Sequence, residues 1–318
     1  MELDLREKID RNIDKYFPGK NFSISNITRV KTKPHSFVFN ALLINSDGEH
    51  EEIYIKQFEP EIKPGLNEII KLKKEWDQIL TPRIIDYFEG DNVVLFEGVQ
   101  GDTLSKNLLL NSYRLSGNAR ESRLFECARK MGNAIGHLQR LTEKGSRKIG
   151  ESNIFIVEQY ESEEYVKEIL GTQSWTEMRP SIEQLKDMKT TLAQFHGDPS
   201  PHNIIMKGNN VFLLDFCYQT NAVFLDPVLF IVSLDLMRAR LPFALNSTIT
   251  QMKTKFLRAY IEATNETWDR DVWSLFEFLT YLHVLMKYET RYKSLKNYIV
   301  ASVDKRHILN KIRNFTKS

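Results

Sequence analysis

The stretch from His196 to Phe216 carries the side chains of this chain best suited to perform chemistry. Asp198 is followed five residues later by Asn203, and Asp215 stands at the end of an apolar run. A carboxylate, an amide and a second carboxylate in this order are the groups that phosphoryl transfer from ATP requires. The first orients an attacking hydroxyl and accepts its proton, and the other two supply oxygen ligands to magnesium. The spacing predicts Asp198 as the catalytic residue and Asn203 and Asp215 as the metal ligands.

The flanking sequence indicates which elements position these groups. Pro199 and Pro201 stiffen the loop between Asp198 and Asn203, because proline fixes φ and removes a donor. Residues 204–206 and 211–214 are predicted to be two short strands joined by a turn at 207–210. Asp215 is therefore expected at a strand end that faces the loop. Residues 181–195 are expected to form a helix that leads directly into this loop.

At these residues the chain resembles a known family. The pattern HxDxxxxN at His196–Asn203, followed by a strand ending in Asp-Phe, is similar to the catalytic segment of aminoglycoside phosphotransferase-like kinases. That group includes choline, homoserine and sugar kinases. The resemblance implies an α+β, two-lobed protein-kinase-like fold with ATP and Mg²⁺ as cofactors. Residues 1–97 would form a nucleotide-binding lobe of antiparallel sheet plus helix, and residues 98–318 a mostly helical catalytic and acceptor-binding lobe.

The first lobe is expected to hold the nucleotide. Lys56 stands on a predicted strand and can reach the α- and β-phosphates if a carboxylate on the next helix orients it. That helix is predicted over 66–80. Glu68 matches the family position of the lysine's partner, and Glu75, on roughly the same face, is left as the alternative. The other predicted elements of this lobe are a helix over 1–20 and strands over 22–30, 36–44, 51–58, 82–88 and 92–96.

Four further residues are predicted to contact the nucleotide. Tyr54 shares a strand face with Lys56, and the resemblance implies that it stacks on adenine, with a core tyrosine as the alternative. Glu97 and Val99 lie in the predicted hinge, where backbone groups would bond the adenine edge. The nucleotide-covering turn at 31–36 contains no glycine, although a close backbone approach to phosphate favours glycine. Ser36 could supply a hydroxyl and an amide there instead.

The second lobe is less distinct in sequence after its first helices, which are predicted over 103–110 and 120–141. Residues 143–180 are interpreted as a linker with part of a substrate-side helix. Asp226, in Leu225-Asp226-Pro227, is expected to brace the catalytic loop. Residues 227–314 are predicted to form four or five helices with buried aromatic stripes.

Composition limits the function classes. The 318 residues are 42% hydrophobic and 27% charged, with a net charge of +2, as in an ordinary soluble globular protein. Cys127 and Cys217 offer no disulfide framework and fit a reducing, cytoplasmic setting. The longest apolar stretch, 222–234, is too short to span a bilayer, so no transmembrane segment is expected. No nucleic-acid motif accompanies the charge, so nucleic acid is not expected as a partner.

The last 32 residues are basic, with nine Lys and Arg against Glu289 and Asp304. This segment is predicted to attract an anionic acceptor, with a peripheral anionic surface or a simple solvated face as the alternatives. The cations chosen to test this prediction are Lys305, Arg306, Lys311 and Arg313.

The sequence around the motif lacks two features of protein kinases, and this indicates the class of acceptor. Gly197 stands where protein kinases commonly have arginine, and no Ala-Pro-Glu-like segment follows Phe216. The chain is therefore predicted to phosphorylate a hydroxyl of a small molecule, a sugar or a glycan precursor. Two alternatives stay open. One is an antibiotic kinase of the aminoglycoside type, and the other is a catalytically silent kinase-like scaffold, which the glycine-free turn favours.

Overall fold

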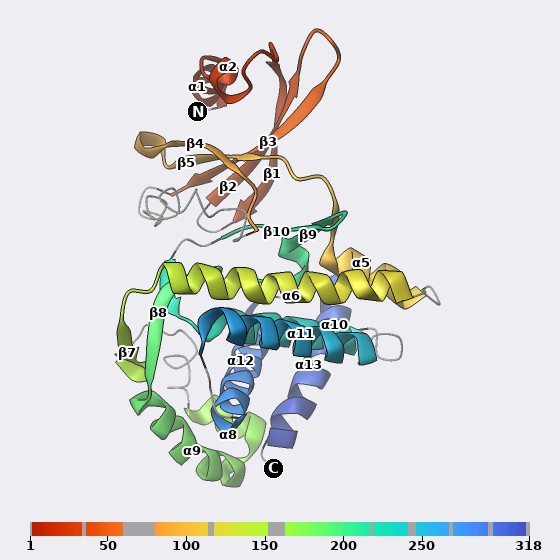
Figure 1. Ribbon diagram of the computed structural model, residues 1–318. Helices are drawn as coiled ribbons and strands as arrows, with labels where there is room; N and C mark the ends of the chain where they lie inside the picture. The colour runs from red at the N-terminus through yellow and green to blue at the C-terminus, as the bar shows by residue number, and fades with distance from the viewer. Residues whose placement is uncertain are drawn as a thin grey trace. The chain divides into compact units, whose positions relative to one another are not determined.

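The computed structural model describes residues 2–33, 36–59, 80–113, 118–151, 163–216, 219–240, 246–266, 270–291 and 295–315. The chain divides into two compact units, Met1–Gly101 and Asp102–Ser318 (Figure 1). The first is built mainly on an antiparallel sheet and the second is mostly helical, which confirms the α+β class. Within the ranges above, the helices are all too short or too polar to cross a membrane.

The first unit is a five-stranded antiparallel sheet in the order β1-β2-β3-β5-β4. Ile9, Ile13 and Tyr16 from two short helices lie in one buried cluster with sheet residues such as Phe39 and Leu43. Burying these apolar side chains together ties the helices to the sheet. The elements are α1 (Glu2–Asp10), α2 (Ile13–Tyr16), β1 (Ser23–Lys33), β2 (Ser36–Ile44), β3 (His50–Phe58), β4 (Ile84–Phe88) and β5 (Val93–Glu97), with a 3-10 turn at Glu89–Asp91.

The helix predicted over residues 1–20 is wrong as a single element. The chain turns at Arg11–Asn12, between α1 and α2. The side-chain amide of Asn12 donates to the carbonyl of Lys8 at 2.8 Å. Asparagine competes with the backbone for hydrogen bonds in this way, which explains why the helix is interrupted there. The helix predicted over 66–80 lies outside the described residues except at its last position.

The second unit combines two small sheets with a set of helices. One sheet has the order β10-β9-β6 and the other β11-β8-β7. The strands are β6 (Asp102–Thr103), β7 (Ser146–Lys148), β8 (Lys189–Phe195), β9 (Ile204–Lys207), β10 (Asn210–Leu213) and β11 (Gln219–Ala222). The helices are α5 (Leu104–Tyr113), α6 (Asn118–Leu141), α8 (Glu163–Leu170), α9 (Thr172–Asp187), α10 (Leu225–Arg240), α11 (Asn246–Thr264), α12 (Arg270–Arg291) and α13 (Leu295–Phe315), with 3-10 turns at Ile149–Glu151 and Pro201–Asn203.

The helix predicted over 181–195 is wrong in its second half. Helix α9 ends at Asp187, Met188 is extended, and β8 continues to Phe195. This strand pairs with β7 on one side and β11 on the other. Pairing with strands distant in sequence outweighs the local helical pattern, and the β-branched pair Thr190 and Thr191 favours it. The loop that begins at His196 is therefore entered from a strand.

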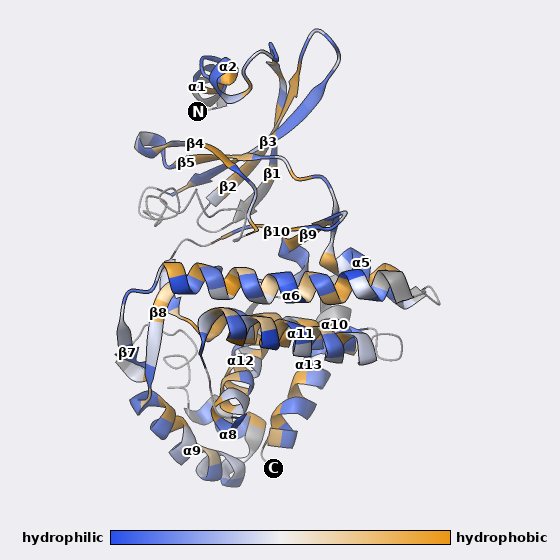
Figure 2. Cartoon of the chain, viewed as in Figure 1, coloured by the Kyte–Doolittle hydropathy of each residue, from blue (hydrophilic) through white to orange (hydrophobic). Residues whose placement is uncertain are grey.

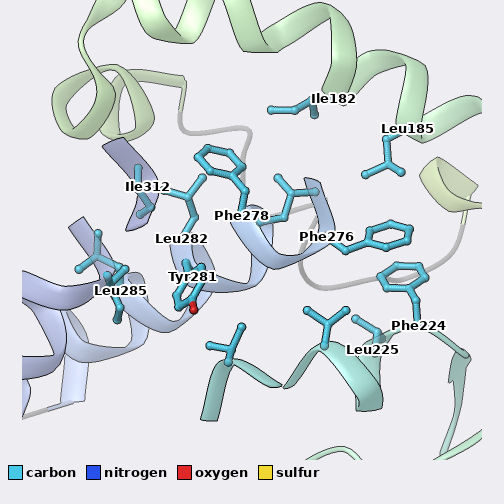
Figure 3. Packing of buried hydrophobic residues seen from close by; sticks show 14 of the residues in the cluster. Ile182, Leu185, Phe224, Leu225, Phe276, Phe278, Tyr281, Leu282, Leu285 and Ile312 are labelled. Atoms are coloured by element: carbon cyan, nitrogen blue, oxygen red, sulfur yellow. The ribbon is translucent and has the colours of Figure 1, made fainter. Parts of the chain in front are cut away.

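The core of the second unit lies among α9, α10, α12 and α13. Phe224 and Phe276 stack with ring centroids 3.7 Å apart and planes 3° from parallel (Figure 3). Tyr281 and Leu282 of α12 are fully buried in the same cluster, as Figure 3 shows. Hydrophobic and hydrophilic residues alternate along α9 and α13 (Figure 2), as expected for helices that bury one side.

Helices α6 and α11 run side by side (Figure 1) and meet through glycine. A Cβ added at Gly132 would overlap the carbonyl oxygen of Phe256, and one at Gly136 would come within 2.7 Å of the Cβ of Ala263. The two backbones can approach this closely only because these two positions of α6 lack side chains.

Gly132→Ala is expected to lower the free energy of unfolding by about 1–3 kcal/mol, because overpacking outweighs the gain in helix propensity of about 1 kcal/mol. Urea unfolding measures the change. Gly90→Ala is the matched control, since a Cβ there meets nothing within 4 Å. Equal effects of the two substitutions would contradict the role of close packing at Gly132.

Candidate active site

The loop after β8 is held by a buried carboxylate. The backbone amides of His196 and Gly197 donate to the two oxygens of Asp226, at 2.7 and 2.9 Å. Asp226 is fully buried in the first turn of α10. This arrangement confirms that Asp226 braces the loop, since each of its oxygens satisfies one amide that would otherwise lack a partner in the protein interior.

Asp198 and Asn203 are joined directly. The side-chain amide of Asn203 donates both to the carbonyl oxygen of Asp198 and to its carboxylate Oδ2, each at 2.9 Å. Asn203 is 9% exposed, whereas Asp198 is an exposed residue. Because both bonds come from the nitrogen, the amide oxygen of Asn203 remains available as a ligand. The carboxylate of Asp198 is oriented and reachable from solvent, as a base acting on a hydroxyl must be.

Asp215 is tied to the same loop through its neighbours. The amide of Leu214 donates to the carbonyl of Asn203 at 2.7 Å. On the other side, the ring of Phe216 lies 4.3 Å from the ring of His196. Asp215 itself has φ +71, in the left-handed region. Aspartate is one of the few residues that adopts this conformation, which turns the chain sharply after β10.

The pKa of the buried Asp226 differs from that of an ordinary aspartate. Burial raises the pKa of Asp226 to about 6, against the hydrogen bonds from the amides of His196 and Gly197, which lower it. Gln139 of α6 hydrogen-bonds to Asp226, donates to the carbonyl of Val223 at 2.9 Å and accepts from the Tyr260 hydroxyl at 2.8 Å. No sequence pattern pointed to Gln139, which acts through Asp226 across a long separation in the chain.

The shifted pKa predicts opposite trends in activity and stability. As pH falls through about 6, protonation of Asp226 should remove one acceptor oxygen, loosen the loop and lower turnover. A pKa raised by folding means that this group stabilises the fold fully below the pKa of the unfolded aspartate, and the contribution is lost as pH rises through about 6. We expect a pH–rate profile with a limb near this value, absent in Asp226→Asn. A limb that persists in that variant would assign the titration to another group.

In the first unit, β3 carries the two residues predicted for phosphate and adenine. Lys56 is 8% exposed, and its ammonium lies 4.9 Å from the centre of the Phe58 ring. Tyr54 is half-buried and shares the face of Lys56, two residues away on the strand. Ser36 begins β2, pairs with Phe58 in register and is buried.

The predicted hinge follows β5. The amide of Glu97 donates to the carbonyl of Arg83 and the amide of Gly98 to the carbonyl of Glu52, at 2.9 and 2.7 Å. The adenine contacts predicted there would therefore use the Glu97 carbonyl and the Val99 amide. The carboxylate of Glu97 is engaged with Arg83 at 3.0 Å. Glu68 and its alternative Glu75 lie outside the described residues.

The donor chemistry of the loop fits a magnesium ion. The amide oxygen of Asn203 and the carboxylate of Asp215 are hard oxygen ligands of the kind that Mg²⁺ prefers. Among the described residues, no three His, Cys, Asp or Glu side chains gather to hold a metal by themselves. Mg²⁺ is usually held by one or two protein ligands, with phosphate and water in the remaining positions, and seldom by a site made of protein alone. The pair of Asn203 and Asp215 suits this arrangement.

Comparison with known proteins agrees with this geometry. Residues 71–228 match the model of the phosphotransferase enzyme family, and this range includes the loop, Asp215 and Asp226. No curated protein is close enough in sequence to count as a relative.

Solved structures share the fold. A glucosamine kinase superposes with a TM-score of 0.66 at 12% identity, covering 95% of this chain and 80% of its own. An amicoumacin kinase in complex with AMP-PNP, Ca²⁺ and Ami superposes at 0.56 with 14% identity, covering 98% and 96%. Macrolide 2′-phosphotransferase from Brachybacterium faecium gives 0.51 at 10% identity, covering 97% and 96%. The resemblance stated from the sequence is thus confirmed: residues 71–228 match the phosphotransferase enzyme family, and the solved kinase structures share the fold of the chain.

Proposed function

We propose that this protein transfers the γ-phosphoryl group of ATP, with Mg²⁺, to a hydroxyl of a small molecule, a sugar or a glycan precursor. The observation that carries the proposal is the double hydrogen bond from the Asn203 amide to Asp198. It orients the proposed catalytic carboxylate and leaves the amide oxygen of Asn203 available as a ligand. A loop with a purely structural role would not need an exposed carboxylate oriented in this way.

Each residue has a defined role in this reaction. Asp198 orients the acceptor hydroxyl and accepts its proton. Asn203 and Asp215 would hold Mg²⁺, which neutralises charge on the phosphates as it develops. Asp226 fixes the backbone that carries Asp198.

The nucleotide roles remain as the sequence suggests them. Lys56, oriented by Glu68, would contact the α- and β-phosphates and Tyr54 would stack on adenine. Ser36 would cover the phosphates, and Glu97 and Val99 would bond the adenine edge. Lys56, Tyr54 and Ser36 stand on neighbouring strands of one sheet, which supports a shared role.

The acceptor is proposed as a sugar or another neutral or anionic alcohol. Support comes from a solved structure of glucosamine kinase in complex with glucosamine, ADP and inorganic phosphate, with a TM-score of 0.64 to this chain at 13% identity. The test is ATP consumption by the whole protein with a pooled set of amino sugars, hexoses and glycan precursors, in the presence of Mg²⁺. Stimulated consumption supports the proposal. No consumption above background with any pool would favour the silent scaffold.

Asp215→Asn is expected to weaken magnesium-dependent ATP binding by at least about 100-fold, since even outer-shell changes at metal sites cost 10–100-fold. Asparagine is chosen because it tolerates the left-handed backbone at this position, so the fold is kept. Calorimetry with and without Mg²⁺ measures the effect. Asp187→Asn, an exposed aspartate paired with Lys148, is the matched control. Unchanged magnesium dependence in Asp215→Asn would remove Asp215 from the metal site.

A further inference from the structure

A tyrosine hydroxyl on α11 is joined to the His196–Asn203 loop by a chain of buried hydrogen bonds. The hydroxyl of Tyr260 donates to Oε1 of Gln139 at 2.8 Å, and it also lies 3.2 Å from the carbonyl oxygen of Val223. Nε2 of Gln139 donates to the same carbonyl at 2.9 Å. Both side chains are buried, so they depend on protein partners for their hydrogen bonds.

The close packing of two helices makes this contact possible. Helix α11 runs alongside α6 (Figure 1), and the two backbones approach closely at Gly136, one turn before Gln139. A Cβ at Gly136 would lie only 3.2 Å from the backbone carbonyl oxygen of Tyr260. Because this position of α6 has no side chain, the hydroxyl of Tyr260 can reach the Gln139 amide.

The hydroxyl of Tyr260 helps to determine which way the Gln139 amide faces. A side-chain amide has one acceptor oxygen and one donor nitrogen. When the oxygen accepts from Tyr260, the nitrogen is directed at the carbonyl of Val223 and the carboxylate of Asp226, which are both acceptors. The reversed amide would place its oxygen against those two acceptors. The surrounding groups therefore favour a single orientation.

Val223 and Asp226 connect this amide to the His196–Asn203 loop. Val223 lies between β11 and α10, and its own amide donates to the carbonyl of Thr191 in β8 at 3.1 Å. Three residues later, Asp226 accepts from the first two backbone amides of the loop. The side chain of Gln139 therefore contacts both the backbone that leads into α10 and the carboxylate that holds the loop.

We propose that Tyr260 is a positioning residue for the His196–Asn203 loop and that it acts through Gln139. Its effect on turnover rests on the proposed function, because the proposed base Asp198 lies in this loop. Its effect on the conformation of the loop does not rest on that function, so it is measured separately, without nucleotide or Mg²⁺.

The first test is hydrogen exchange of the whole protein carrying Tyr260→Phe. This substitution removes the hydroxyl and keeps the ring, so the packing of α11 against α6 should be retained. The buried Oε1 of Gln139 loses its donor. We expect exchange of the His196 and Gly197 amides to become about tenfold faster, as the loss of one buried hydrogen bond implies.

Tyr281→Phe is the matched control, because it also removes a buried tyrosine hydroxyl. That hydroxyl donates to Asp235 at 2.7 Å. Both variants should lower the overall stability, but only Tyr260→Phe should accelerate exchange at the start of the loop. Equal acceleration in the two variants would mean that the loop responds to global stability alone, and it would overturn the positioning role.

A double-mutant cycle tests whether Tyr260 acts through Gln139. Gln139→Met keeps the length of the side chain and removes the amide. In this background, Tyr260→Phe should change exchange of the loop amides much less than it does in the wild type, because the group that transmits its effect is already absent. Fully additive effects of the two substitutions would show that the residues act independently, and the proposal would be wrong.

Turnover supplies the last readout. With any acceptor that the wild type phosphorylates, Tyr260→Phe should lower kcat and leave the KM for ATP unchanged, since the residues proposed to contact the nucleotide lie in the first unit. An unchanged kcat would overturn the role of Tyr260 in the reaction. If the wild type phosphorylates no acceptor, the proposed function fails, and the exchange experiments still decide whether Tyr260 positions the loop.

Discussion

Asp198→Asn is expected to lower turnover by about two to four orders of magnitude while ATP affinity stays within a few-fold. Asparagine has nearly the shape of aspartate, and its oxygen can still accept the hydrogen bond that Asn203 donates to Oδ2. The loop should therefore keep its conformation. What is lost is the negative charge that orients the acceptor hydroxyl and takes its proton.

Single-turnover kinetics and calorimetry on the same preparation separate these two quantities. Asp187→Asn again serves as the control for removing an exposed carboxylate. If binding and turnover fall together in Asp198→Asn, Asp198 supports the structure of the loop and the assignment of the base is wrong. A loss confined to turnover supports the proposed role, because only the group that acts on the acceptor has been changed.

Asp235→Ala is expected to destabilise the protein by about 3–5 kcal/mol, the usual effect of removing one partner from a buried ion pair. The side chain of Asp235 is fully buried, and the cations of Lys253, Arg238 and Lys311 lie 2.8, 3.3 and 3.7 Å away. The hydroxyl of Tyr281 also donates to it, at 2.7 Å. Alanine would leave the buried Tyr281 hydroxyl and these three partly buried cations without their shared carboxylate.

The pH dependence of this effect has a definite sign. Burial raises the pKa of Asp235, but the charges of Lys253 and Lys311 outweigh it and the pKa lies below its usual value. The stabilisation is therefore present above the pKa of the unfolded aspartate and lost as pH falls through the lowered one. The loss of unfolding free energy caused by Asp235→Ala should be greatest at neutral pH and should become smaller in acid. Urea unfolding at several pH values measures it.

An exposed pair gives the matched comparison. Glu262 and Arg258 form an ion pair at 2.8 Å on the surface of α11. Glu262→Ala is expected to change the free energy of unfolding by less than about 0.5 kcal/mol. The attraction between two exposed charges is only slightly stronger than their interaction with water. A comparable loss in Asp235→Ala and Glu262→Ala would show that burial does not decide the contribution of these charges.

The buried network also corrects one expectation about the basic C-terminal segment. Lys311 was predicted to serve the acceptor, but its ammonium faces Asp235. Asp304, one of two acids in the segment, is fully buried and binds Arg240 of α10 at 3.0 and 2.5 Å. Part of this charge therefore holds α13 against α10. The prediction that the segment steers an acceptor now rests on Lys305, Arg306 and Arg313.

Short-range features of this protein follow from the sequence by itself. Asp198 and Asn203 are five residues apart, so their hydrogen bond depends on the loop alone. The hairpin of β9 and β10 forms across a turn that the sequence marks with glycine and asparagine. The strands of the first unit and the run of helices from residue 227 onward were predicted for the same reason, because propensity and periodicity act within one element. The α+β class came from the family resemblance.

Features that join distant segments were decided by the tertiary structure. Residues 189–195 become a strand because β7 and β11 supply partners on both sides, which outweighs local propensity. Gln139 reaches Asp226 only once α6 and α10 are packed. The charges around Asp235 come from α10, α11 and α13. The pKa of a buried group depends on which charges and donors surround it, and these are set when the helices pack, not by the order of residues along the chain.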